Sequence, residues 1–286
     1  MRIFGKVRSG VSRLVSATAG LTALPLKAIG LRSRARVLEP LTEDMISVTT
    51  IPGGQIRFFT PSPLLISRAV SVLSKEPDTI RWIDGFDDRA VFWDVGANVG
   101  VYSLYAAVRK AVSVLSFEPS AANFHVLSKN IELNQLCERI TAYCVALSGQ
   151  TRLGVLNIAS SSMGAALSQF GRPGEMSPWS EGQRGATTHG MIGFAIDEFV
   201  AQFDPPFPDY LKLDVDGLEL PILQGASRTL RDPRLQSIMV ELSLTHNDDS
   251  HEARSLIEGA GLRFVSRGAT QSTQTESGAN HLFMRG

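Results

Sequence analysis

The fold is decided by a stretch that begins Val91-Phe92-Trp93-Asp94-Val95-Gly96-Ala97-Asn98-Val99-Gly100 and ends Val112-Ser113-Val114-Leu115-Ser116-Phe117-Glu118-Pro119. Between its two apolar runs lies a segment with helical periodicity. The order strand, glycine turn, helix, strand and acidic residue is typical of the first half of a nucleotide-binding α/β fold. We therefore expect a doubly wound, mostly parallel sheet.

The glycine turn and the acidic residue predict a ligand site. In an open parallel sheet, ligands bind beyond the carboxyl ends of the strands. Gly96 and Gly100 allow the backbone to approach a ligand, and the following helix N-terminus offers free N–H groups. Glu118 ends the second strand, where an ionised carboxylate suits the two hydroxyls of a ribose.

The spacing of the turn narrows the choice of ligand. A dinucleotide site requires Gly-x-Gly-x-x-Gly, but Asn98 and Val101 occupy the second and third glycine positions. The missing second glycine disfavours a pyrophosphate, and Asp94 before the turn suits a ligand with an amine. S-adenosylmethionine has an amine and a ribose but no phosphate. The alternative is a purely structural glycine turn.

Several motifs together resemble the FkbM family of S-adenosylmethionine-dependent methyltransferases. The resemblance extends from about residue 61 to the C-terminus and rests on the motifs already quoted and on Leu211-Lys212-Leu213-Asp214-Val215-Asp216-Gly217-Leu218-Glu219. The family usually has Asp-Val-Glu-Gly in this last motif, and here Asp216 replaces the Glu.

The resemblance implies a class I methyltransferase fold, which is Rossmann-like with a mostly parallel sheet. The apolar runs over 262–266 and 281–284 predict an antiparallel last strand, and the residues before the sheet form an N-terminal extension. The resemblance also implies O-methylation of a hydroxyl on a sugar, glycan or polyketide-type acceptor. The alternative functions are a non-catalytic module that binds S-adenosylmethionine and a partner module docked on a membrane.

The candidate general bases are Asp214, Asp216 and His246. The two aspartates follow the predicted fourth strand, Tyr210–Leu213, and His246 lies beyond the fifth. A base assists attack by a hydroxyl on a methyl group. Two carboxylates alone do not indicate a metal site, so no metal is expected. Ala146 follows the third strand, at the position where such folds contact adenine.

The charge distribution predicts the domain organisation. Residues 1–38 hold eight of the 28 basic residues and none of the 28 acidic ones, so the remainder carries 20 basic and 28 acidic residues. We predict a basic arm over 1–38, a lead-in hairpin and helices covering the cleft over 39–90, and a methyltransferase domain over 91–286. The arm either lies on a membrane surface or packs on the body; its apolar run is too short to span a bilayer.

The segment 149–193 is rich in Gly and Ser, and we expect a flap facing the acceptor, with one strand over Arg152–Ile158. Asp204-Pro205-Pro206-Phe207 resembles a loop of enzymes that methylate amino groups. Because it precedes the fourth strand, it does not predict a nucleic-acid substrate. Cys144 is expected to be buried, and the two cysteines favour a cytoplasmic protein. The oligomeric state is left open.

Overall fold

The computed structural model describes residues 31–172, 187–243, 247–268 and 278–286. The chain forms two compact units, residues 1–45 and residues 46–286. The described part of the first unit is helix α3 (Leu31–Glu43). The domain boundaries predicted at residues 38 and 90 stay predictions. In the described part of the chain, no helix combines the length and hydrophobicity needed to cross a bilayer.

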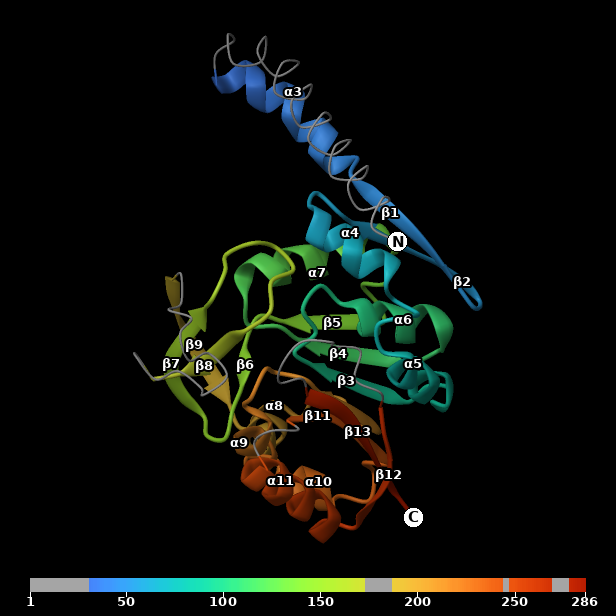
Figure 1. The fold of residues 1–286 in the computed structure, drawn as a ribbon, viewed down its shortest axis with the longest axis vertical. Coiled ribbons are helices and arrows are strands. Elements are labelled where there is room, and N and C mark those ends of the chain that lie inside the picture. Colours follow the sequence, from blue (N-terminus) through green and yellow to red (C-terminus); the bar gives the residue numbers. More distant parts are fainter. Residues whose placement is uncertain (1–30, 173–186, 244–246, 269–277) are drawn as a thin grey trace, which may run out of the picture. The chain divides into compact units, whose positions relative to one another are not determined.

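The larger unit is built on a seven-stranded sheet (Figure 1). Its order is β12 (Leu262–Arg267), β13 (Gly278–Arg285), β11 (Ser237–Ser243), β10 (Tyr210–Leu213), β3 (Val91–Val95), β4 (Ser113–Phe117) and β5 (Ile140–Tyr143). Strand β13 is antiparallel to both of its neighbours, and the pairs from β11 to β5 are parallel. The predicted class I sheet is thereby confirmed.

The strand order reverses beside β3. From β3 the chain adds β4 and β5 on one side, and it later places β10 and β11 on the other. Such a reversal leaves a crevice at the carboxyl ends of the central strands, which is where ligands bind in open α/β sheets. The sheet topology therefore points to the ends of β3, β4 and β10.

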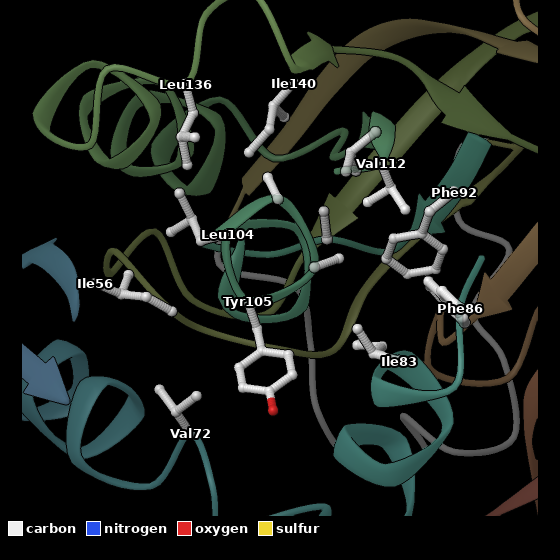
Figure 2. Packing of buried hydrophobic residues seen from close by; sticks show 14 of the residues in the cluster. Ile56, Val72, Ile83, Phe86, Phe92, Leu104, Tyr105, Val112, Leu136 and Ile140 are labelled. Carbon is white, nitrogen blue, oxygen red and sulfur yellow. The ribbon is translucent and has the colours of Figure 1, made fainter. Parts of the chain in front are cut away.

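Helices cover both faces of the sheet. Alternate residues of a strand point to opposite faces, and Phe92 of β3 packs in one core cluster while Trp93 and Val95 pack in another. The first cluster contains residues of α5 (Pro77–Asp84), α6 (Val101–Arg109) and α7 (Ala121–Leu133). The second contains residues of α8 (Ile196–Phe203), α9 (Glu219–Gln224), α10 (Ser227–Arg231) and α11 (Asn247–Gly259). Figure 2 shows Leu104 and Tyr105 of α6 among the first cluster.

The predicted lead-in hairpin is confirmed as β1 (Ile46–Ile51) paired antiparallel with β2 (Gly54–Phe59). Helix α4 (Pro63–Val70) follows, and its N-cap Ser62 accepts a hydrogen bond from the backbone of Leu65. Leu65 and Ala69 are buried on its inner side.

The described residues of the segment after β5 form a second sheet, and that this segment faces the acceptor stays a prediction. The order of this sheet is β6 (Ala146–Leu147), β9 (Thr187–Phe194), β7 (Arg152–Ile158) and β8 (Ser168–Gly171). The strand predicted over 152–158 is confirmed as β7. The other strands escaped prediction because their glycines resemble loop residues. A Cβ at Gly154 or Gly193 would lie within 2.6 Å of the Phe170 ring, so these glycines make room for that ring.

The prediction that Cys144 is buried is wrong. The residue is exposed, because it follows β5, the edge strand of the large sheet. Residues 204–209 connect α8 to the start of β10, as their position before the fourth strand predicted.

Candidate functional site

An open cavity, with about 550 Å³ of empty space that includes solvent at its mouth, lies at the carboxyl ends of β3, β4 and β10. Six of the predicted site residues line it, namely Gly96, Asn98, Glu118, Ala146, Asp214 and Asp216. Apolar side chains form much of the remaining wall, including Phe117, Val145, Leu147, Phe170 and Leu218. The cavity thus joins an apolar region to a group of acids, a combination common in small-molecule sites.

Gly96 brings the turn after β3 against the end of β10. Its φ is +83°, and a Cβ there would lie 1.8 Å from the Asp214 carbonyl oxygen. Only glycine fits this position without moving the backbone. Gly100 also has a φ of +83°, but it is the N-cap of α6, and a Cβ there would lie 2.5 Å from Leu127 Cδ1. The structure gives Gly100 a packing role.

Asn98 presents an unused acceptor at the cavity. Its φ is +51°, which is a conformation that asparagine tolerates better than most residues. Its Nδ2 donates to the Ala165 carbonyl oxygen over 3.0 Å. Its Oδ1 is buried and has no hydrogen-bond partner among the described residues. Because such atoms are normally paired, this oxygen suits a ligand that brings an N–H or O–H donor.

Glu118 is fixed by the backbone on both sides. Its Oε2 accepts from Asn98 N and its Oε1 accepts from Ser120 N, each over 2.8 Å. A carboxylate has about four lone-pair sites, so acceptor capacity remains for a ligand hydroxyl. Burial raises the pKa of Glu118 to about 7, even though these hydrogen bonds favour the ionised form.

A row of buried polar side chains runs across the sheet beneath the site. Asp94 of β3 lies between Ser116 of β4 and Lys212 of β10 in the strand register. Its Oδ2 accepts from Ser103 over 2.5 Å, and Ser103 in turn hydrogen-bonds Ser116. Asp94 is 1 % exposed, and burial raises its pKa. The prediction that Asp94 orients a ligand amine stays a prediction; in this structure its carboxyl group is buried against α6.

Asp214 forms an ion pair with Lys212 and lies near the strand that carries Glu241. The Lys212 Nζ lies 2.5 Å from Asp214 Oδ2, and Lys212 is 1 % exposed. Glu241, near the end of β11, lies on the strand next to β10, which Asp214 follows. Burial alone would raise the pKa of Asp214, but the charge and hydrogen bond of Lys212 lower it well below the usual range. Asp214 is therefore an ionised acceptor and a weak base.

A second cavity of about 440 Å³ adjoins the first. The two share Gly96, Asn98 and Asp214. The second is lined by charged and polar groups of α4, α6 and the segment between α4 and α5, including Arg68, Lys75, Glu76 and Tyr102. Burial lowers the pKa of Arg68, against the attraction of Asp214 and Asp216. This cavity offers cations as well as acids.

The segment Gly164–Leu167 contributes Ala165 and Ala166 to the wall of the first cavity. It is held by side chains from distant parts of the sequence. The Arg68 guanidinium donates to the Gly164 carbonyl oxygen, and the Asn123 Oδ1 accepts from Gly164 N over 2.8 Å. Asp216 Oδ2 accepts from Leu167 N over 2.7 Å. Burial raises the pKa of Asp216. Asp216 thus anchors this segment at the cavity.

Several residues that the structure brings to the site were not predicted: Arg68, Asn123, Lys212 and Glu241. Lys212 had a signal, because it is the one charge inside the apolar strand Tyr210–Leu213. The other three are recognised only from the tertiary structure. His246 lies outside the described residues.

Comparison with known proteins identifies the family of this chain. Residues 94–264 match the methyltransferase FkbM domain. The chain belongs to the FkbM methyltransferase family. It is also 26% identical to the hexuronic acid methyltransferase AglP of Haloferax volcanii over 196 residues, covering 68% of this chain and 73% of that protein. The chain is therefore an S-adenosylmethionine-dependent methyltransferase.

Solved structures resemble the FkbM chain at low sequence identity. Trm5b of Pyrococcus abyssi is 12% identical, with a TM-score of 0.48, over 84% of this chain and 56% of that one. TYW2 of M. jannaschii, solved in complex with AdoMet, is 8% identical, with a TM-score of 0.42, over 84% of this chain and 87% of that one.

Proposed function

We propose that this enzyme binds S-adenosylmethionine in the first cavity and transfers its methyl group to a hydroxyl oxygen of a sugar acceptor bound in the second. The carrying observation is that the two cavities meet at Gly96, Asn98 and Asp214. A methyl donor and an acceptor must meet at one point in line, and much of the rate enhancement comes from that alignment.

The first cavity fits the cofactor in its chemistry. Apolar side chains and Ala146 would hold the adenine, and Glu118 would accept from the ribose hydroxyls. The amino-acid end of S-adenosylmethionine would point towards the second cavity. The unpaired Asn98 Oδ1 and the ionised Asp214 lie at that junction and would contact it. When bound, the cofactor supplies an electrophilic methyl group on a cationic sulfur.

The second cavity suits an acidic sugar. Arg68 and Lys75 line it, and cations of this kind bind carboxylates. The relative from Haloferax volcanii is named for hexuronic acid. We infer that the acceptor is a uronic acid or a glycan that contains one. The candidate bases for its hydroxyl are Asp214, Asp216 and His246. Of the two aspartates, Asp216 is the stronger base, because burial raises its pKa, whereas Lys212 lowers the pKa of Asp214.

A second candidate reaction is methylation of the uronate carboxylate itself, which would give an ester. The same two cations favour it, because they would hold the carboxylate inside the cavity. A carboxylate is already ionised and needs no base.

The test is a transfer assay with methyl-labelled S-adenosylmethionine. The acceptors are a methyl glucuronoside, the matching neutral glucoside, a polyketide alcohol and a transfer RNA. We expect label on the glucuronoside in preference to the glucoside, and label that resists mild alkali, because ethers survive where esters hydrolyse. Alkali-labile label supports the ester reaction, and label on none of these acceptors contradicts the proposal.

We also propose that the N-terminal arm makes peripheral contact with an anionic membrane surface from the cytoplasmic side. Helix α3 exposes Leu31, Leu38 and Leu41 and carries Arg32 and Arg36, a combination typical of interfacial helices. The exposed free thiols of Cys137 and Cys144 suit a reducing compartment. Cosedimentation with phosphatidylserine vesicles tests the contact: the double variant R32E/R36E should lose it, and equal binding contradicts it.

A further inference from the structure

Glu76 brings a carboxyl group to the second cavity from the start of α5. The residue is the N-cap of this helix, and because Pro77 follows it, a helical backbone is disfavoured at Glu76. Its side chain makes no hydrogen bond to the described backbone of the helix. Instead it lines the second cavity and is 14 % exposed. The carboxyl group is therefore available to the cavity.

One oxygen of Glu76 is fixed by two donors. Thr79 Oγ1 donates to Glu76 Oε2 over 2.9 Å, and Asn280 Nδ2 of β13 donates to the same oxygen over 2.8 Å. Asn280 also donates to Thr79 Oγ1 over 3.2 Å, so the two donors hold each other in place. The other oxygen, Oε1, lies 3.4 Å from the Nζ of Lys75, whose side chain is 58 % exposed. Because a carboxylate has about four lone-pair sites, Oε1 keeps acceptor capacity for a ligand.

Lys212 connects Glu76 to the junction of the two cavities. Its Nζ lies 2.5 Å from Asp214 Oδ2 and 3.9 Å from Glu76 Oε2, and it lies 5.0 Å from the centre of the Tyr102 ring. Asp214 lines both cavities, so a single ammonium group separates Glu76 from the junction. Two carboxylates on either side of one cation can accept hydrogen bonds from neighbouring hydroxyls of one sugar ring.

The simplest role for Glu76 would be to balance the charge of Lys212, but its contacts support a further role. Asp214 already forms the closer ion pair with Lys212, at 2.5 Å against 3.9 Å. The hydrogen bonds from Thr79 and Asn280 also fix the carboxyl group, which leaves Oε1 in a defined position at the cavity. Polar groups that are held in this way by their neighbours are typical of those that orient a ligand.

We propose that Glu76 binds the acceptor, and that its Oε1 accepts a hydrogen bond from a sugar hydroxyl next to the one that is methylated. The inference rests on the proposed function, and it adds a hydroxyl-binding group to the cavity that Arg68 and Lys75 line as cations. The acceptor is then held by a hydroxyl as well as by its carboxylate. Two such contacts fix the orientation of the ring and decide which hydroxyl reaches the methyl group. A site that hydrogen-bonds a substrate hydroxyl also rejects analogues that lack it.

The test is calorimetric titration of a methyl glucuronoside, and of the matching neutral glucoside, into the full chain with S-adenosylhomocysteine, which has no methyl group to transfer. In Glu76→Gln, the glutamine oxygen takes the position that accepts from Thr79 and Asn280, so its NH₂ group faces the cavity. We expect this variant to bind both sugars at least about tenfold more weakly, because the hydrogen bond to a charged acceptor is lost.

Two further variants accompany Glu76→Gln. Glu76→Asp keeps the negative charge beside Lys212 but withdraws the carboxyl group by one methylene, so it should also weaken the binding of both sugars. Glu252→Gln is the matched control, because Glu252 is an exposed acid of α11 and should leave the binding of both sugars unchanged. Circular dichroism checks the fold of each variant.

Charge balance alone predicts a different result. Removal of a negative charge beside Arg68 and Lys75 would strengthen the binding of the glucuronoside and leave that of the glucoside unchanged. Either this pattern, or equal binding by the wild type and a folded Glu76 variant, overturns the inference while leaving the cofactor site intact. A wild type that binds S-adenosylhomocysteine but neither sugar overturns both the inference and the proposed acceptor, and a folded wild type that binds no S-adenosylhomocysteine overturns the proposed cofactor site.

Discussion

Asn98 and Glu118 each serve the turn and the cavity at once. Glu118 accepts the Asn98 backbone N–H, so the loop geometry and the proposed ribose acceptor depend on one carboxyl group. Asn98 leaves an oxygen unpaired inside the protein, which costs free energy until a donor arrives. Residues that carry such a cost in the free protein are candidates for ligand contact.

Replacing Asn98 by glycine isolates that side chain. Glycine keeps the positive φ of 51° without strain, while it removes both the unpaired oxygen and the bond to Ala165. We expect the affinity for S-adenosylmethionine to fall by roughly tenfold, which corresponds to about one lost hydrogen bond. Calorimetry measures the affinity and circular dichroism checks the fold; a folded variant that binds as the wild type does would remove Asn98 from the site.

Among the elements, the strands of the large sheet could be predicted from the sequence, but the position of segment Gly164–Leu167 at the cavity could not. Strands β3, β4 and β10 have apolar runs bounded by turn residues, so local pattern reveals them. The position of Glu241 beside the end of β10 depends on β10 and β11 lying side by side, which no local pattern contains. Segment Gly164–Leu167 is held at the cavity by side chains that are distant in the sequence, namely Arg68 of α4, Asn123 of α7 and Asp216.

The hold of α7 on that segment is testable through Asn123. Its amide donates to the Ala165 carbonyl oxygen over 2.9 Å and accepts from Gly164 N. Asn123→Ala should free the segment and speed the dissociation of S-adenosylmethionine by roughly tenfold, since two hydrogen bonds are lost. Stopped-flow displacement measures the rate.

The matched control for this variant is Asn134→Ala. Asn134 caps the end of α7 and bonds the backbone of Arg57, so its loss should reduce stability and leave dissociation unchanged. Equal dissociation rates in the two variants would show that Asn123 does not hold segment Gly164–Leu167 at the cavity.

At the scale of the whole molecule, burial of acids links stability to pH. Burial raises the pKa of Glu118 and of Glu219 to about 7. Folded pKa values above the unfolded value of 4.5 mean that the folded state binds protons more tightly. This stabilisation is present below about pH 4.5 and is lost as the pH rises towards 7, at most roughly 3 kcal/mol for each group.

Glu219→Gln tests the sign of this linkage. The glutamine side chain keeps an oxygen that can accept from Val215 N and Gly217 N, as the Glu219 carboxyl does, but it cannot ionise. The variant should gain stability relative to the wild type as the pH rises from about 5 to about 7.5, the range in which the buried carboxyl loses its proton. Urea unfolding at both pH values gives the difference. The exposed Glu138 supplies the control, Glu138→Gln, and a difference that shrinks with rising pH would contradict the account.

The two compact units predict a separable arm. Both cavities are lined by residues of the unit 46–286, so removal of residues 1–45 should leave the affinity for S-adenosylmethionine within about twofold and abolish vesicle binding. Calorimetry and cosedimentation on the shortened chain check the two effects. Loss of cofactor affinity in a folded protein would show that the arm contributes to the site.

Calorimetric titration of S-adenosylmethionine into the wild type and into Glu118→Gln tests where the cofactor binds. We expect one cofactor per chain and an affinity at least tenfold lower in the variant, because charged acceptors make the stronger hydrogen bonds. Absence of binding to the folded wild type, or equal binding by the folded variant, would contradict the placement of the cofactor in the cavity between β3, β4 and β10.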